Sequence, residues 1–186
     1  MQYTRNHNLL FTPGTLTIGA EQNFNELKDA MPGYHRSIDQ EVIIIGAFAQ
    51  NEWKTEHMTI LVGIRADKHN LLDNVIVSPR LTFKYDFDNI LQTRMSFGTD
   101  YRAPQAYDED LHVAAVGGEV HLISLANDLG PERSYTISFS GDLYNNSKEM
   151  PANFLTELFY THLSDVFILE EKGLTPQGNG ILERRN

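Results

Sequence analysis

The sequence contains no cysteine. This absence excludes a disulfide framework, a zinc site with thiolate ligands and a cysteine nucleophile. The sequence also lacks any apolar run that approaches the roughly 18 residues of a membrane-spanning helix. Strands can cross a membrane without such a run, because their side chains alternate between two media. Helical spans are therefore excluded, whereas spanning strands are not.

Basic residues are scarce. The chain has 15 Lys and Arg residues against 25 Asp and Glu residues, which gives a formal net charge of −10. Binding to DNA or RNA depends on clustered positive charge, so we expect no nucleic-acid partner. The N-terminal sequence MQYTRNHNLLFTPG also lacks the basic start and apolar core of a secretory signal. If the protein is exported, we expect its signal to lie upstream.

The dominant pattern in the chain has a period of two residues, which is the signature of strands with two different faces. It is clearest in residues 134–144, where aromatic and aliphatic residues alternate with Thr, Ser and Asp. The same pattern predicts further strands over residues 15–24, 42–53, 58–69, 80–85, 91–98 and 154–163, with a weaker one over 166–170. The sequence thus predicts an all-β fold with an antiparallel up-and-down meander of about 7–8 strands.

The connections between these strands alternate in length. Short connections are expected at residues 54–57, 86–90 and 145–151, and longer ones at 25–41, 70–79 and 102–133. Tight turns at one end and long loops at the other are typical of an outer-membrane barrel. A soluble antiparallel sandwich also alternates, although its connections are usually more even. The pattern alone leaves both folds open.

One side of the expected strands is rich in charge. In a barrel, this side would face a wet lumen. The residues concerned are Arg65, Asp67, Arg80, Lys84, Arg94 and Asp142.

Four segments carry a resemblance to a known family. They read GAFAQNEWK from residue 46, SPRLTFKYDFDN from 78, GTDYRAPQAYDEDLH from 98 and NDLGPERSYTISFSGDLY from 127. In this order they resemble strand and loop motifs of TonB-dependent receptors, including the G-x-x-[FY]-R-A-P signature at residues 98–104. Gly130 stands where a Lys is usual. The residues of these four segments most resemble those of receptors from the Bacteroidota.

The resemblance implies that residues 1–186 are part of a larger transmembrane β-barrel of about 22 strands in the outer membrane of a Gram-negative cell. The plug domain, the TonB box and the C-terminal strands are expected to be absent. It further implies a transporter, not an enzyme, that imports a scarce nutrient such as a ferric siderophore, haem or cobalamin. The implied partners are the TonB-ExbB-ExbD complex, through the plug and TonB box, together with outer-membrane lipid and a small-molecule or metal-chelate ligand.

Ligand contacts are expected in the long loop that follows the Arg-Ala-Pro signature, because long loops on a rigid scaffold are frequent recognition sites. The acidic run in this loop lacks the ligand spacing and central glycine of a calcium loop, so no metal site or cofactor is predicted. Five other histidines, His7, His35, His57, His69 and His162, are expected at polar surface or rim positions. The candidate ligand-binding residues are Arg102, Gln105, Tyr107, Asp108, Asp110, His112 and His121.

Two alternatives remain at this level. The first is a soluble β-rich surface or adhesin-type binding domain, which would need a closed apolar core. The second is an outer-membrane hydrolase that uses Asp108 or Asp110. No set of nucleophile, base and orienting residue can be assigned from the sequence to support the second.

Overall fold

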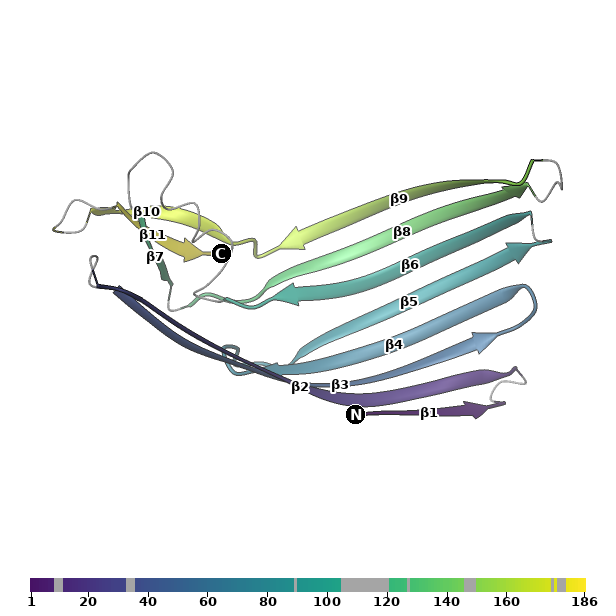
Figure 1. Ribbon diagram of the computed structural model, residues 1–186, viewed down its shortest axis with the longest axis horizontal. Helices are drawn as coiled ribbons and strands as arrows, with labels where there is room; N and C mark the ends of the chain where they lie inside the picture. Colours follow the sequence, from purple (N-terminus) through teal and green to yellow (C-terminus); the bar gives the residue numbers. More distant parts are fainter. Residues whose placement is uncertain are drawn as a thin grey trace.

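The computed structural model of the chain consists of two β-sheets (Figure 1). The structure describes residues 1–8, 12–32, 36–88, 90–104, 121–126, 128–145, 150–174, 176 and 180–186. The large sheet is antiparallel and contains β1 (Gln2–His7), β2 (Gly14–Met31), β3 (Arg36–Lys54), β4 (Met58–His69), β5 (Ile76–Phe87), β6 (Leu91–Arg102), β8 (Glu132–Asn145) and β9 (Ala152–Ser164), in that order. The small sheet has the order β10 (Ile168–Leu174), β11 (Gly180–Arg185) and β7 (His121–Leu125). Among the described residues, no helix is long and apolar enough to cross a membrane.

The predicted antiparallel meander is confirmed, since each strand of the large sheet pairs with the next one in the chain apart from β7. The connections at residues 55–57, 88–90 and 146–151 lie at one end of this sheet, which we call the turn end. At the turn between β5 and β6, Asp88 adopts a left-handed conformation with a φ of 48°, which Asp tolerates better than most residues. The opposite end, which carries the connections at residues 32–35, 70–75 and 103–131, is called the loop end.

The prediction of a long loop over residues 25–41 is wrong. β2 continues to Met31 and β3 begins at Arg36, and the two strands remain paired throughout. β4 pairs with β3 only from Ile44 onward, so the ends of β2 and β3 form a two-stranded ribbon that projects beyond the sheet (Figure 1). Apart from the buried Val42, the side chains described in this ribbon are exposed or half-buried, so the sequence need not alternate there. A segment whose sequence does not alternate can therefore still form a strand.

Three further strands have no counterpart in the sequence prediction. β1 pairs with β2, β7 lies within the loop predicted over residues 102–133, and β11 lies near the end of the chain. β7 pairs in parallel with β11, although these strands are separated by more than fifty residues. Parallel partners far apart in the chain leave no local pattern that period analysis could detect.

The large sheet has two chemically distinct faces. Its register aligns five apolar residues across β4, β5, β6, β8 and β9, namely Val62, Leu81, Phe97, Ile137 and Tyr160. The neighbouring rung on the opposite face contains Gly63, Arg80, Gly98, Thr136 and Thr161. We call these the apolar face and the polar face. The six charged residues expected to share one side, Arg65, Asp67, Arg80, Lys84, Arg94 and Asp142, all lie on the polar face by register, which confirms that grouping.

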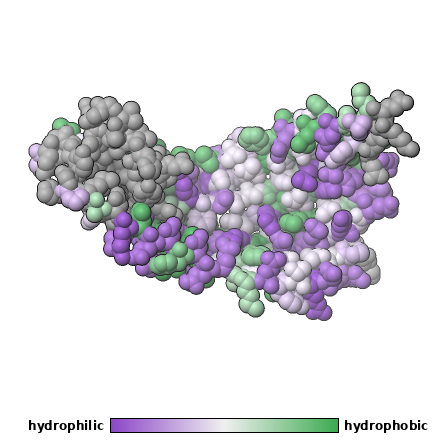
Figure 2. Space-filling view, in the orientation of Figure 1, coloured by the Kyte–Doolittle hydropathy of each residue, from purple (hydrophilic) through white to green (hydrophobic). Residues whose placement is uncertain are grey.

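The large sheet is a single layer, and its apolar face is exposed. Ile64 and Phe139, near the middle of their strands, are 53% and 51% exposed. Figure 2 shows hydrophobic side chains reaching the surface along the sheet, beside hydrophilic ones. The buried hydrophobic residues of the described part of the chain are only Val42, Leu72, Ile76 and Ala103. A soluble sheet would cover such a face with a second layer.

Two prolines limit strand pairing toward the loop end. Pro79 has no N–H to donate, and the ladder between β5 and β6 stops at the pair Arg80 and Gly98, one residue short of it. Beyond this point the two strands diverge (Figure 1). β6 itself ends at Arg102, two residues before Pro104. The divergence opens space on the polar face.

Candidate ligand-binding site at the loop end of the sheet

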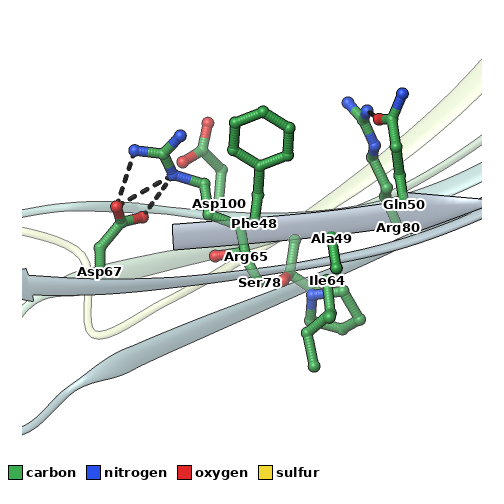
Figure 3. Close-up of a pocket in the computed structure, with 11 residues that line it drawn as sticks. Phe48, Ala49, Gln50, Ile64, Arg65, Asp67, Ser78, Arg80 and Asp100 are labelled. Atoms are coloured by element: carbon green, nitrogen blue, oxygen red, sulfur yellow. Dashed lines mark hydrogen bonds and ion pairs between the residues drawn. The ribbon is translucent and has the colours of Figure 1, made fainter. Parts of the chain in front are cut away.

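Two cavities lie toward the loop end and share the side chains of Arg65, Asp67 and Asp100. The first, about 360 Å³, lies where β5 and β6 diverge, and its lining includes Phe48 and Arg80 (Figure 3). The second, about 320 Å³, lies closer to the loops and is lined by Glu21, Asn23, Ile44, Arg65, Asp67, His69, Asp100, Tyr101, Arg102 and Ala103. Charged side chains therefore dominate the second cavity.

An ion-pair network lines both cavities. Arg65 Nε donates to both carboxylate oxygens of Asp67, at 2.9 and 2.7 Å, and its Nη2 donates to Asp67 Oδ1 at 2.7 Å (Figure 3). The same Nη2 reaches Glu21 Oε1 at 2.6 Å. The Asp67 side chain is only 4% exposed, whereas that of Glu21 is 54% exposed. Arg65 thus balances the charge of the buried Asp67 carboxylate and links it to Glu21 on β2.

Glycine provides the space for this network. Gly46 on β3 lies directly opposite Asp67 on β4. A Cβ atom at Gly46 would collide with the carboxylate of Asp67 and the guanidinium of Arg65. Without a side chain, Gly46 lets this bidentate pair lie flat on the sheet. Arg80 lies across Gly63 in a similar way and donates to Gln50 (Figure 3).

His69 is the most deeply buried large side chain of the site, with 1% exposure. Its Nδ1 accepts a hydrogen bond from the Leu71 N–H at 3.1 Å, so the proton of the neutral ring resides on Nε2. Burial lowers the pKa of His69, which keeps the ring neutral, although the nearby charge of Asp67 acts in the opposite direction. Nε2 has no hydrogen-bond partner among the described residues. His69 lies at the rim of the sheet, as one half of the prediction had it, because β4 ends there. It is buried, however, so the expectation of a polar surface position is wrong.

Arg102 is the one predicted ligand-binding side chain within the described part of the chain. It lines the second cavity, and its Nη2 donates to Glu132 Oε2 at 3.1 Å. For His121 the structure describes only the backbone, in β7 opposite Gly180. The other predicted residues lie outside the described residues, namely Gln105, Tyr107, Asp108, Asp110 and His112. Their roles stay predictions.

Of the ten lining residues of the second cavity, only Arg102 was among the predicted ligand-binding residues. The nine that were missed include the charged and polar side chains of Glu21, Asp67, His69 and Asp100. Asp67 was recognised in the sequence only as a residue of the polar face. The register between β2, β3 and β4 brings Glu21 and Asp67 within reach of Arg65. No local motif carries that information, because register depends on pairing over long distances in the chain. Among the described residues, no group of three or more His, Cys, Asp or Glu side chains could hold a metal ion.

A family model described as TonB dependent receptor-like, beta-barrel, matches residues 1–184. The chain belongs to the TonB-dependent receptors. The resemblance noted in four segments of the sequence is thus confirmed over nearly the whole chain. No curated protein matches the sequence of this receptor chain.

Solved structures of similar fold include siderophore receptors and an iron transporter. The receptor chain is similar to the siderophore receptor PirA from Pseudomonas aeruginosa, with a TM-score of 0.78 and 18% identity over 100% of this chain and 35% of PirA. It is similar to a mutant of the ferric enterobactin receptor PfeA from the same organism, solved with enterobactin, with a TM-score of 0.73 and 15% identity over 100% of this chain and 30% of PfeA. For the FrpB iron transporter from Neisseria meningitidis the TM-score is 0.63 and the identity 13%, over 100% of this chain and 30% of FrpB. The chain spans about a third of the length of these solved receptors.

Proposed function

We propose that the chain forms part of the barrel wall of an outer-membrane, TonB-dependent transporter that imports a metal chelate. The observation that carries this proposal is the contrast between the two faces of a single-layered sheet. Apolar side chains of five neighbouring strands align on one face, and charged and hydroxyl side chains align on the other. A wall between lipid and a wet lumen requires this arrangement.

Strand length supports the same assignment. β4, β5 and β6 contain 12 residues each, and β8 contains 14. A tilted strand needs about 9–11 residues to cross the hydrocarbon layer. The central strands are therefore long enough to cross the membrane and to reach past it at the loop end, which we assign to the cell exterior.

We propose that residues 1–186 are one part of the barrel domain of a longer receptor. The outer edges of β1 and β9 have no neighbouring strand among the described residues. Unsatisfied backbone groups cost several kcal/mol each in lipid, so further strands are needed to close the wall. A plug domain with a TonB box would then connect the receptor to the TonB-ExbB-ExbD complex, and the apolar face would contact outer-membrane lipid.

The proposed substrate is an iron chelate or a related metal chelate, such as a ferric siderophore, haem or cobalamin. The similar solved structures include a siderophore receptor, a ferric enterobactin receptor and an iron transporter. The charged second cavity at the loop end offers both donors and acceptors to a polar ligand. We propose ligand contacts for Arg102, Gln105, Tyr107, Asp108, Asp110, His112 and His121. Import would then be a binding event without bond chemistry in the protein.

The proposal can be tested in the bacterium that encodes the chain. An antibody raised against residues 1–186 is used to follow the protein through membrane fractionation and urea washing. We expect it in the urea-resistant outer-membrane fraction. Deletion of the gene should abolish growth on at least one ferric chelate as the sole iron source, and excess ferrous iron should restore growth. A water-soluble protein would overturn the transporter assignment in favour of a soluble surface domain. A membrane protein whose loss affects no metal chelate would overturn the substrate class alone.

A further inference from the structure

The small sheet is joined to the loop end of the large sheet through one aromatic ring. Phe167 lies between β9 and β10, at the point where the chain passes from one sheet to the other. The guanidinium carbon of Arg102 lies 4.9 Å from the centre of this ring, and that of Arg184 lies 5.8 Å from it. Arg102 belongs to β6 and Arg184 to β11, so the ring is held by one cation from each sheet.

A single carboxylate fixes the position of this ring. Glu132 Oε2 accepts a hydrogen bond from Arg102 Nη2 at 3.1 Å and another from the Phe167 N–H, also at 3.1 Å. Arg102 and Glu132 form the last rung of the ladder between β6 and β8. The Glu132 side chain is 13% exposed and that of Arg102 is 49% exposed, so the carboxylate is shielded from water while the guanidinium is partly open to it.

Further hydrogen bonds support the same junction. Asn186 donates to the carbonyl oxygens of Gly130 and Asp165, at 3.3 and 3.0 Å, and accepts from the Gly130 N–H at 3.3 Å. Arg184 is only 2% exposed. This burial restricts the movement of its side chain relative to Phe167. Asn186 directly follows β11. Its hydrogen bonds therefore join the end of the small sheet to the segment before β8 and to the segment after β9.

Arg102 also lines the second cavity, and its side chain is 49% exposed. The same guanidinium therefore faces the cavity and holds the ring. An acidic or carbonyl oxygen of a ligand that approached Arg102 would compete with Glu132 for its donors. A change at Arg102 would in turn alter both the shape of the cavity and the attachment of the small sheet.

We propose that Arg102 is a positioning residue, which acts with Glu132 and Phe167 as a clasp that holds the small sheet at the loop end, beside the second cavity that Arg102 also lines. The clasp goes beyond the proposed import function, because it concerns the position of the small sheet whatever the ligand is. Without it, the small sheet keeps its own ladders and the hydrogen bonds of Asn186, but it loses the contacts of Arg102 and Glu132 with Phe167. We expect such a sheet to occupy several positions relative to the large one.

The test measures the position of the small sheet directly. The chain contains no cysteine, so nitroxide labels can be attached at Asp73→Cys, in the loop between β4 and β5, and at Leu174→Cys, at the end of β10. Both positions are exposed. The distance distribution between the two labels is recorded by double electron–electron resonance on the complete receptor purified in detergent, with any cysteine outside residues 1–186 replaced by serine. This readout needs no transport, so its failure is distinct from failure of the proposed function.

Wild-type protein should give one narrow distance peak. Arg102→Gln, Glu132→Gln and Phe167→Leu should each add a population at other distances, and Arg102→Lys should give an intermediate result, because Lys keeps the charge but loses the planar stacking on the ring. The matched control is Arg133→Gln, which removes one positive charge from the next residue in β8 but lies on the apolar face by register. Circular dichroism verifies that each variant retains its strands. An unchanged distribution in Arg102→Gln, or an equal change in Arg133→Gln, would overturn the clasp.

Discussion

At the scale of single residues, Gly46 determines whether the Arg65–Asp67 pair can form. The pair occupies the space that a side chain at this position would fill. Replacement by Ala should push the two charged groups apart, and overpacking of this kind costs roughly 1–3 kcal/mol. We expect Gly46→Ala to lower the midpoint of urea unfolding of the receptor in phospholipid vesicles. Gly98→Ala is the matched control, because nothing lies within 4 Å of a Cβ atom built there. Equal midpoints for the two variants would contradict the steric account.

A second prediction concerns the buried carboxylate of Asp67. Arg65→Gln removes its ionic partner and leaves a side chain with 4% exposure charged and unpaired. Breaking a buried pair in this way costs about 3–5 kcal/mol, whereas removal of both charges is much less costly. Arg65→Gln should therefore destabilise the receptor strongly, and the double variant with Asp67→Asn should recover much of the loss. Additive effects in the same vesicle unfolding assay would show that the pair is not coupled. Lys172→Gln, which breaks exposed pairs with Glu170 and Glu183, should cost less than about 1 kcal/mol.

At the scale of elements, the ribbon formed by the ends of β2 and β3 differs from the rest of the sheet. Beyond Ile44, β3 pairs with no strand other than β2 among the described residues, and β2 pairs there only with β3. Asn70 still binds the backbone of Glu41 and Ile43, so the unsupported part of the ribbon begins beyond these residues. A two-stranded ribbon is only marginally stable in water. Backbone amides of residues 25–31 and 36–40 should therefore exchange with deuterium faster than those of residues 44–54, as measured by mass spectrometry. Comparable protection in both parts would mean that another segment covers the ribbon.

The sequence predicted the elements whose two faces meet different surroundings. The strand predicted over residues 58–69 coincides with β4, and the shared polar face followed from alternation alone. Alternation failed where both faces of a strand have the same surroundings, as in the β2–β3 ribbon. It also could not reveal β7, whose partner β11 is distant in the chain.

The same limit applies to the site. Charge on alternate residues placed Arg65 and Asp67 on one face. The meeting of Arg65 with Glu21, however, depends on the register of three strands. The burial of His69 also arises from packing at the loop end, which periodicity does not describe.

At the scale of the whole molecule, the open edges of the large sheet matter most. The apolar face is exposed, and the outer edges of β1 and β9 are unpaired among the described residues. Water disfavours the exposed apolar face, and lipid disfavours the unpaired strand edges. The sheet is therefore suited to neither medium until further strands close it into a barrel. Closure also removes the two edges at which other chains could pair and aggregate.

We therefore expect residues 1–186, expressed alone behind a signal peptide, not to form a stable membrane protein. The same residues within the complete receptor should resist unfolding in detergent at room temperature and shift in gel mobility only after heating, as closed barrels do. The comparison is made with one antibody on matched membrane fractions, and a strand-preserving variant such as Gly98→Ala in the complete receptor controls for the effect of substitution itself. A heat-modifiable, membrane-embedded species formed by residues 1–186 alone would mean that the sheet closes by another route, for example by pairing of β1 with β9 within one chain or between copies. A cooperatively folding species in water would instead mean that the apolar face packs against itself, and the proposed place of this sheet between lipid and lumen would be wrong.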